Sequence, residues 1–308
     1  MIRGLHHVTA TVDGAQEDLN FFAKVLGLRL VKKTVNFDNP KVYHLYYGTE
    51  LGAPGTLMTT FPYRAWGVPV GSHGTGQVNE TRFAIPMGSA DFWSGHLTER
   101  GRTPLEAESP FGERSVAISD PSGLRIVLVE GADSREGWGS DGIPLSDAIT
   151  GLHSVSFPVA DAGPSVEFLT THLGWNVVDE TDAVTRMAVD TGGPGKWLDI
   201  ATAQEGTPGV NGIGTVHHVA MAVDGDEAQA GFRQQLLDAG THVTEVKDRQ
   251  YFRSIYFREP GGVLYEIATI PPGFAIDEAP DELGTELKLP PSEEGNRREL
   301  QWALPRLS

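Results

Sequence analysis

The chain has 308 residues, of which 39% are hydrophobic, enough to build a core for two ordinary domains. Its formal net charge is −17 and its pI is near 4.9. This charge argues against a nucleic-acid or anionic-membrane partner, because both need clustered Lys and Arg. The chain contains no cysteine, which excludes disulfide bonds, thiolate catalysis and cysteine zinc sites.

The N-terminal residues lead directly into a strand-like run, with no charged segment followed by the apolar stretch of a signal peptide. No apolar run approaches the roughly 18 residues that a membrane-spanning helix needs. We therefore expect a cytoplasmic protein with no membrane partner.

Four copies of one unit follow each other along the chain. Gly4-Leu-His-His-Val-Thr returns as Gly151-Leu-His-Ser-Val-Ser and as Thr215-Val-His-His-Val-Ala, and a more divergent copy begins near Gln77. After each of these strands the sequence predicts a helix that stops at a glycine. The four predicted helices cover residues 16–26, 90–100, 164–173 and 227–239.

Each copy ends in about three strands, and Pro-Ser-Gly and Pro-Gly-Gly at 121–123 and 260–262 predict hairpin turns between the last two. In such a βαβββ unit the helix covers one face of the sheet and leaves the other bare, so two units must pair to close a barrel-like cavity. The sequence therefore predicts an α+β fold of four βαβββ modules, paired into two barrel-like domains.

We place the boundaries as follows. An N-terminal domain, 1–145, holds modules 4–62 and 77–131, and a C-terminal domain, 150–275, holds modules 151–204 and 214–270. The acidic, glycine-rich residues 131–149 are the predicted linker. A tail at 276–308 carries one predicted short helix at 297–304.

Each His-His pair lies in a predicted strand, where successive side chains point to opposite faces. His7 shares its face with other polar residues and His218 shares its face with small residues, so both are expected to face the cavity. Glu266 lies in an apolar strand, where an unpaired carboxylate would be costly to bury. Two histidines and one carboxylate form the facial triad typical of non-haem Fe(II).

Alignment of the modules sharpens this hypothesis. The three donors can meet only if the first module faces the fourth across one cavity. His153 and Asp199 would be a competing site, although alternation places His153 on an apolar face. The aligned positions are His7, Ser154 and His218 on the first strand, and Thr59, Val127, Asp199 and Glu266 on the last strand.

The repeat and the triad resemble the vicinal oxygen chelate superfamily and, within it, the hydroquinone-cleaving ring dioxygenases. The likeness spans nearly all of residues 4–290, including Tyr43-His-Leu-Tyr-Tyr47, Gly52-Ala-Pro-Gly-Thr-Leu-Met-Thr-Thr-Phe-Pro62, Ala84-Ile-Pro-Met-Gly88 and Pro260-Gly-Gly262. The resemblance implies Fe(II) held by His7, His218 and Glu266, with Mn(II) as an open alternative. It also implies catalytic or substrate-contacting roles for His6, Thr9, His217, Arg249 and Tyr256.

Strict alternation points His6 and His217 away from the cavity, so their implied roles require the strands to twist or bulge. The alternative is that both are buried histidines bonded to the backbone. We interpret His44, His73 and His96 as structural or surface residues.

The resemblance implies an enzyme that opens a hydroquinone ring beside a ligated hydroxyl, with a small aromatic diol and O2 as partners. Three alternatives stay open. A catechol-cleaving dioxygenase would keep the triad, and a glyoxalase-type isomerase would want a fourth protein ligand where Thr59 stands. A non-catalytic binding protein would not need the complete triad. Assembly into a homo-oligomer is also left open.

Overall fold

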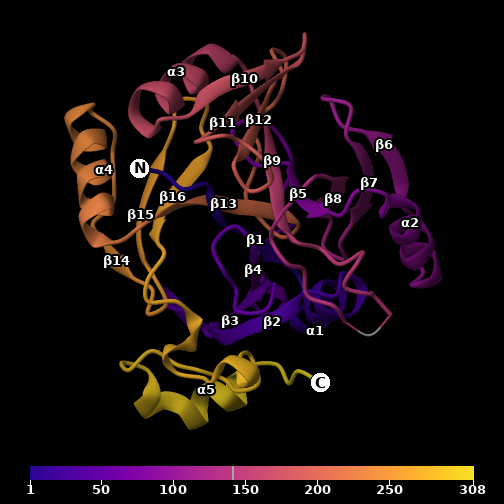
Figure 1. Ribbon diagram of the computed structural model, residues 1–308. Helices are drawn as coiled ribbons and strands as arrows, with labels where there is room; N and C mark the ends of the chain where they lie inside the picture. The colour runs from indigo at the N-terminus through magenta and orange to yellow at the C-terminus, as the bar shows by residue number, and fades with distance from the viewer. Residues whose placement is uncertain (141) are drawn as a thin grey trace.

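The computed structural model describes residues 1–140 and 142–308. It confirms the α+β class and the four βαβββ modules (Figure 1). The first module contains β1 (Leu5–Val12), α1 (Ala15–Leu19), a π-helical segment (Asn20–Val25), β2 (Arg29–Asn36), β3 (Asn39–Gly48) and β4 (Leu57–Pro62). The second contains β5 (Glu80–Ile85), α2 (Ala90–Glu99), β6 (Leu105–Glu108), β7 (Arg114–Ser119) and β8 (Arg125–Glu130).

The second half of the chain repeats this order. The third module contains β9 (Gly151–Val159), α3 (Ala162–Leu173), β10 (Asn176–Glu180), β11 (Val184–Ala188) and β12 (Trp197–Thr202). The fourth contains β13 (Thr215–Val223), α4 (Asp226–Asp238), β14 (Lys247–Asp248), β15 (Arg253–Arg258) and β16 (Leu264–Thr269).

All four predicted helices are present within one or two residues of their predicted ends. The signals at the ends of α3 are plain: the side chain of Asp161 accepts a hydrogen bond from the backbone N–H of Gly163, and Gly174 ends the helix with a φ of 71°. The first helix differs from the prediction, because after Leu19 it continues as a π-helix instead of an α-helix.

The strands form two eight-stranded sheets, each made from two modules. In the first sheet, β1 of the first module pairs antiparallel with β13 of the fourth. In the second sheet, β5 of the second module pairs antiparallel with β9 of the third. The predicted pairing of the first module with the fourth is therefore confirmed. The strand orders are β14-β15-β16-β13-β1-β4-β3-β2 and β10-β11-β12-β9-β5-β8-β7-β6.

The sheets group the modules differently from the predicted grouping of neighbours along the chain. Through their first strands, the first module joins the fourth and the second joins the third. Each sheet thus takes one module from either side of residues 131–149. The boundaries 1–145, 150–275 and 276–308 themselves stay a prediction. In the predicted linker, residues 131–140 and 142–149 add no helix and one isolated bridge, between Ser140 and Ile143, while position 141 lies outside the described residues.

The C-terminal tail returns to the first module (Figure 1). Its predicted helix is present as α5 (Arg297–Ala303), and Leu287 pairs in parallel with Lys33 of the edge strand β2. Lys32 is fully buried beneath it, and its ammonium group contacts the carboxylates of Asp277 and Glu278. The tail is therefore tied to the sheet by an internal ion pair as well as by apolar packing.

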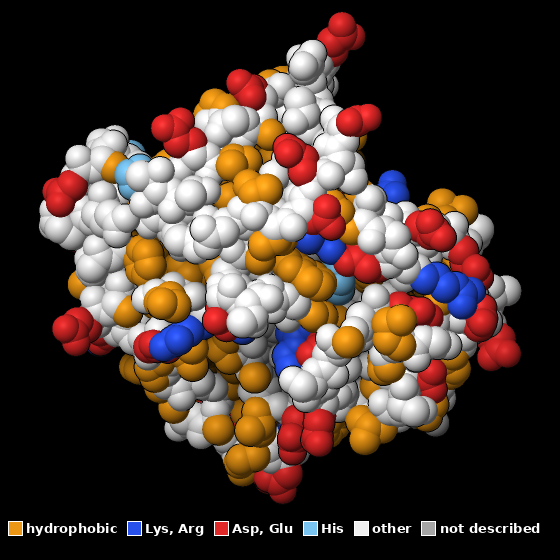
Figure 2. All heavy atoms as spheres, turned by 45° about the horizontal axis from the view of Figure 1, so that its top comes forward, with side chains coloured by type: hydrophobic (Ala, Val, Ile, Leu, Met, Phe, Trp, Pro, Cys, Tyr) orange, Lys and Arg blue, Asp and Glu red, His pale blue; other side chains and the backbone are white. Residues whose placement is uncertain are grey.

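The surface matches the composition. On the face shown in Figure 2, acidic side chains are spread widely and basic side chains are fewer. No helix in the described parts of the chain is long and apolar enough to cross a membrane.

Candidate metal centre

Two β-bulges shape the junction between β1 and β13. Leu5 pairs with Met221 and His7 with Ala220, so His6 is an extra residue on β1. On the opposite strand, Thr9 pairs with His218 and Ala10 with Val216, so His217 is the extra residue. A bulge breaks the alternation of side chains, which allows neighbouring histidines to lie on the same side of the sheet.

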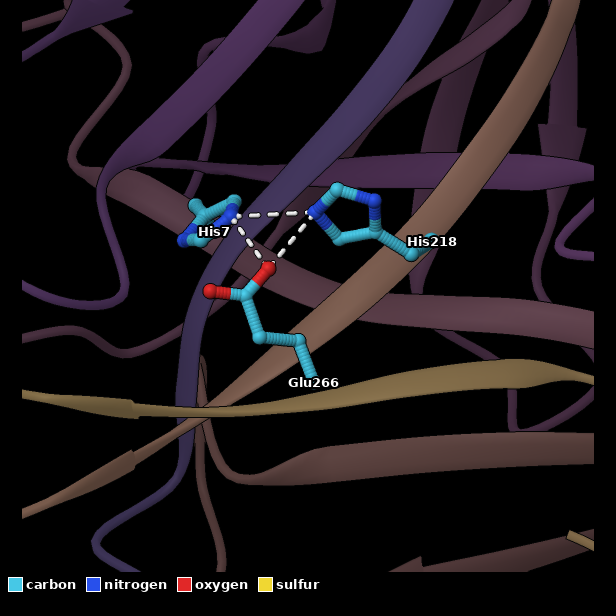
Figure 3. A group of neighbouring side chains, drawn as sticks. All are labelled: His7, His218 and Glu266. Atoms are coloured by element: carbon cyan, nitrogen blue, oxygen red, sulfur yellow. Dashed lines mark hydrogen bonds and ion pairs between the residues drawn. The ribbon is translucent and has the colours of Figure 1, made fainter. Parts of the chain in front are cut away.

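The structure brings together the three donors that the sequence singled out (Figure 3). His7 comes from β1, His218 from β13 and Glu266 from β16, and one donor atom from each lies within 4.8 Å of the others. Glu266 Oε2 lies 2.8 Å from His218 Nε2 and 3.4 Å from His7 Nε2, and the two Nε2 atoms are 3.3 Å apart. All three side chains are buried.

This donor set fits a divalent cation. Although Glu266 Oε2 lies 2.8 Å from His218 Nε2, no described residue donates a well-aligned hydrogen bond to it, and the carboxylate is fully buried. Its burial would raise the pKa of Glu266, but the facing imidazoles of His7 and His218 outweigh that effect and hold the pKa well below its usual range. A buried carboxylate that stays ionised, with two converging imidazole nitrogens, matches the donors of a 2-His-1-carboxylate site.

Each of the two central histidines has a second histidine behind it. His6 Nδ1 lies 2.9 Å from His7 Nδ1, and His217 Nδ1 lies 2.8 Å from His218 Nδ1. Burial lowers the pKa of both His6 and His217 to about 3, so both rings are neutral and can accept a hydrogen bond. If His7 and His218 donate from Nδ1, their Nε2 lone pairs are free to point at a metal.

A third contact orients the carboxylate. Ser254 Oγ, on β15, donates a hydrogen bond to Glu266 Oε1, which leaves Oε2 directed toward the histidines. Ser254 is fully buried, so water does not compete for this bond. Ser254 is not among the candidate site residues predicted from the sequence. Its position opposite the glutamate strand could have been found only from the register of β15 and β16.

His7, His218 and Glu266 line a cavity of about 400 Å³, whose wall is formed by residues from both edges of the first sheet. Arg249 and Tyr256, both singled out from the sequence, line it, whereas His6 and Thr9 are buried beside it without lining it. Arg249 Nε donates a hydrogen bond of 3.2 Å to the hydroxyl oxygen of Tyr256. Most of the remaining wall is aromatic or polar: Thr11, Asn36, Phe37, Asp38, His44, Tyr46, Phe61, Tyr63, Val68, Asn211, Gly212, His217 and Phe252.

His44 is one of the wall residues that sequence reasoning left aside. Its Nδ1 lies 2.8 Å from the hydroxyl of Tyr46 and its Nε2 lies 2.9 Å from Thr59 Oγ1, which in turn lies 2.7 Å from Thr9 Oγ1. Burial lowers the pKa of His44 well below its usual range, so this chain contains a neutral ring. Thr59 thus hydrogen-bonds protein groups at the place where a fourth metal ligand would otherwise stand.

The two other histidines interpreted as structural or surface residues show no link to the cavity. His96 is buried and its Nε2 bonds the carbonyl oxygen of Val25 at 2.9 Å. His73 is exposed.

The competing site in the second sheet is filled by arginine. Asp199 Oδ2 accepts hydrogen bonds from Arg82 Nη1 at 2.5 Å and Arg186 Nη2 at 3.0 Å. His153 is again the extra residue of a bulge, because Arg82 pairs with Ser154 and Phe83 with Leu152. Its ring therefore leaves the apolar face on which alternation placed it, and its Nε2 lies 3.7 Å from Glu113 Oε1. Two guanidinium groups hold the carboxylate that a metal would need.

Comparisons with known proteins identify the family of this chain. Residues 151–267 match the family described as the Glyoxalase/Bleomycin resistance protein/Dioxygenase superfamily. The chain is 43% identical over 305 residues to the "Putative ring-cleaving dioxygenase MhqE" of Bacillus subtilis (strain 168), covering 99% of each protein. It is 37% identical to the "Chlorohydroquinone/hydroquinone 1,2-dioxygenase" of Sphingobium indicum, covering 97% of this chain and 95% of that protein.

Solved structures show the same fold. The crystal structure of a "putative dioxygenase" from Bacillus subtilis aligns with a TM-score of 0.94 at 38% identity, over 100% of this chain and 98% of that one. Glyoxalase I from Zea mays aligns with a TM-score of 0.65 at 15% identity over 86% of this chain and 92% of that chain, which supports the fold alone. With full-length relatives of this identity, the chain belongs to the glyoxalase, bleomycin resistance protein and dioxygenase superfamily, in the branch whose relatives carry ring-cleaving dioxygenase names.

Proposed function

We propose that this protein is an Fe(II)-dependent dioxygenase that opens the ring of hydroquinones beside one hydroxyl, with O2 as the second substrate. One observation carries the proposal: His7, His218 and Glu266 converge at the end of a cavity lined by aromatic side chains. Three protein ligands leave coordination positions open for a substrate oxygen and dioxygen. The name of the Sphingobium indicum relative supports a 1,4-diol as the substrate.

A bound Fe(II) ion would acidify a ligated phenol and make dioxygen chemistry available beside the ring. The protein's part is to hold the three donors in one geometry. In this proposal His6 and His217 accept the Nδ1 protons of His7 and His218, and Ser254 fixes the second oxygen of Glu266. These contacts would keep the Nε2 and Oε2 atoms aimed at one point.

In this proposal Tyr256 binds the ligated oxygen of the substrate. Its hydroxyl oxygen already accepts from Arg249 Nε, so its own proton is free to be donated into the cavity. Burial raises the pKa of Tyr256, which keeps that proton in place at neutral pH. The Arg249 guanidinium, beside it, would stabilise negative charge that develops on the ring oxygen.

The cavity size suits one aromatic ring with small substituents. A volume of about 400 Å³ lies at the lower end of the range for small-molecule sites. Phe61 and Phe252 offer faces against which a ring could pack.

Oxygen uptake tests the proposal. Protein loaded anaerobically with Fe(II) would be offered hydroquinone, methylhydroquinone, chlorohydroquinone and catechol side by side. We expect uptake with the three 1,4-diols and little with catechol. Uptake with catechol alone would keep the metal centre and replace the substrate, and absence of uptake from protein shown to hold iron would refute the reaction.

A further inference from the structure

An ion pair at the rim of the cavity joins the two modules of the first sheet. Asp38 lies in the turn between β2 and β3, and Arg249 follows β14, so they come from opposite edges of the sheet. Arg249 Nη2 donates to Asp38 Oδ2 at 3.0 Å, and Lys247 Nζ lies 3.5 Å from Asp38 Oδ1. Both Asp38 and Arg249 line the cavity.

This pair sets the charge that the cavity presents. Arg249 is the only lysine or arginine among the described residues that line it, and Asp38 and Glu266 are its two carboxylates. Glu266 faces the histidines of the metal centre. Although partial burial opposes ionisation, Arg249 and Lys247 hold the pKa of Asp38 below its usual range. Asp38 therefore stays ionised and offsets part of the positive charge of Arg249 at the rim.

We propose that Asp38 determines substrate specificity: it occupies Arg249, so the cavity accepts 1,4-diols with neutral ring substituents and rejects those bearing a carboxylate. The inference rests on the proposed function and narrows its substrate class. Two physical effects act in the same direction. Asp38 repels an anionic substituent, and it occupies the guanidinium nitrogen that would otherwise bind that substituent.

The side chain of Asp38 is available for substitution. It is 60% exposed, and the turn is held by a different bond, from the backbone N–H of Asp38 to Asn36 Oδ1 at 2.9 Å. Asp224 provides a matched control, because it is 55% exposed, pairs with Arg3 at 2.5 Å and does not line the cavity. Both residues can be changed to asparagine with almost no change in size.

Equilibrium binding tests the inference without turnover. Hydroquinone and 2,5-dihydroxybenzoate would be titrated calorimetrically into protein loaded with Zn(II), which does not activate dioxygen. We expect wild-type protein to prefer hydroquinone, and Asp38→Asn to shift the ratio of the two dissociation constants about tenfold toward the carboxylated ring. Asp38→Glu, which keeps the charge, and Asp224→Asn should leave the ratio within about threefold of wild type.

Three results would overturn the inference. The ratio of the two dissociation constants could stay unchanged in Asp38→Asn, or it could shift equally in Asp224→Asn. Wild-type protein could also prefer the carboxylated ring. Oxygen uptake by Fe(II)-loaded wild-type protein separates this failure from failure of the reaction. If uptake occurs with hydroquinone and the ratio does not shift, only the role of Asp38 is refuted. If the ratio shifts and no diol supports uptake, the reaction is refuted and the charge selection by Asp38 stands.

Discussion

Asp18 is a buried acid whose ionisation should make the stability of the fold depend on pH. It lies on α1 and is 2% exposed. Its Oδ2 accepts hydrogen bonds from Tyr47 at 2.7 Å and Thr60 at 2.5 Å, while Oδ1 has no partner among the described residues. Burial raises the pKa of Asp18 from 3.8 to about 7, against the opposing effect of the two hydroxyl groups.

The sign and size of the effect follow from linkage. Because the pKa in the folded state is raised, the folded protein holds a proton that the unfolded chain releases near 3.8. The stabilisation is fully present below that value and is lost as the pH rises through about 7. A shift of roughly three units corresponds to about 4 kcal/mol of unfolding free energy, at about 1.4 kcal/mol per unit.

Asp18→Asn should remove this contribution, because an amide does not titrate. Urea unfolding of metal-free wild-type and variant protein, from about pH 4 to about pH 8, measures it as the difference between the two free energies. Burial also raises the pKa of Asp120, to about 6, so Asp120 makes the free energy of unfolding fall with rising pH in both proteins. This contribution largely cancels in the difference between them. A difference that stays constant between pH 4 and pH 7 would refute the assignment to Asp18.

The remaining predictions concern the metal centre. Glu266→Ala should lose the metal on gel filtration, and retention of stoichiometric iron with turnover would exclude the triad. His217→Phe should weaken the metal affinity about 10–100-fold in a chelator competition, because His218 loses its Nδ1 partner. Tyr256→Phe should keep the metal and lower kcat about 10²-fold, so that unchanged turnover would remove Tyr256 from the reaction. Metal analysis should give one ion per chain, since Arg82 and Arg186 occupy Asp199, and two ions per chain would contradict that reading.

The modules and the three central donors were predictable because they depend on patterns that the chain repeats. Apolar periodicity and glycine stops recur in each copy, which is why α3, α4 and the hairpin turns agree closely with the sequence. His7, His218 and Glu266 could be chosen because a buried strand carboxylate needs a partner of opposite charge. The pairing of the first module with the fourth followed from requiring those three residues to meet.

The orientation of the second histidine in each pair could not be predicted. Alternation assigns a face to every strand residue only while the register is regular, and the bulges at His6 and His217 interrupt it. A bulge depends on how two distant strands fit, which no local sequence pattern records. The same limit explains His153, which alternation placed among apolar side chains.

Residues of the cavity wall were harder to find for another reason. His44 and Asp38 belong to the first module, whereas Tyr256 and Arg249 belong to the fourth, and the two sets meet only after the sheet has formed. By itself an aspartate in a short turn is typical of a solvated loop. Only its contact with Arg249, which the structure shows, marks Asp38 as a residue of the cavity wall.

Each of the two sheets buries a carboxylate, but the two sheets give it different partners. A carboxylate lies on the last strand of a module in both, as Glu266 in the first sheet and Asp199 in the second, and each is fully buried. In the second sheet Arg82 bridges Glu80 and Asp199 with charged hydrogen bonds, so the protein supplies its own cation. In the first sheet the described neighbours of Glu266 include no lysine or arginine bonded to it, only His7, His218 and Ser254. A bound divalent cation would supply in the first sheet the positive charge that Arg82 and Arg186 supply in the second, and for this reason we propose the metal centre in the first sheet.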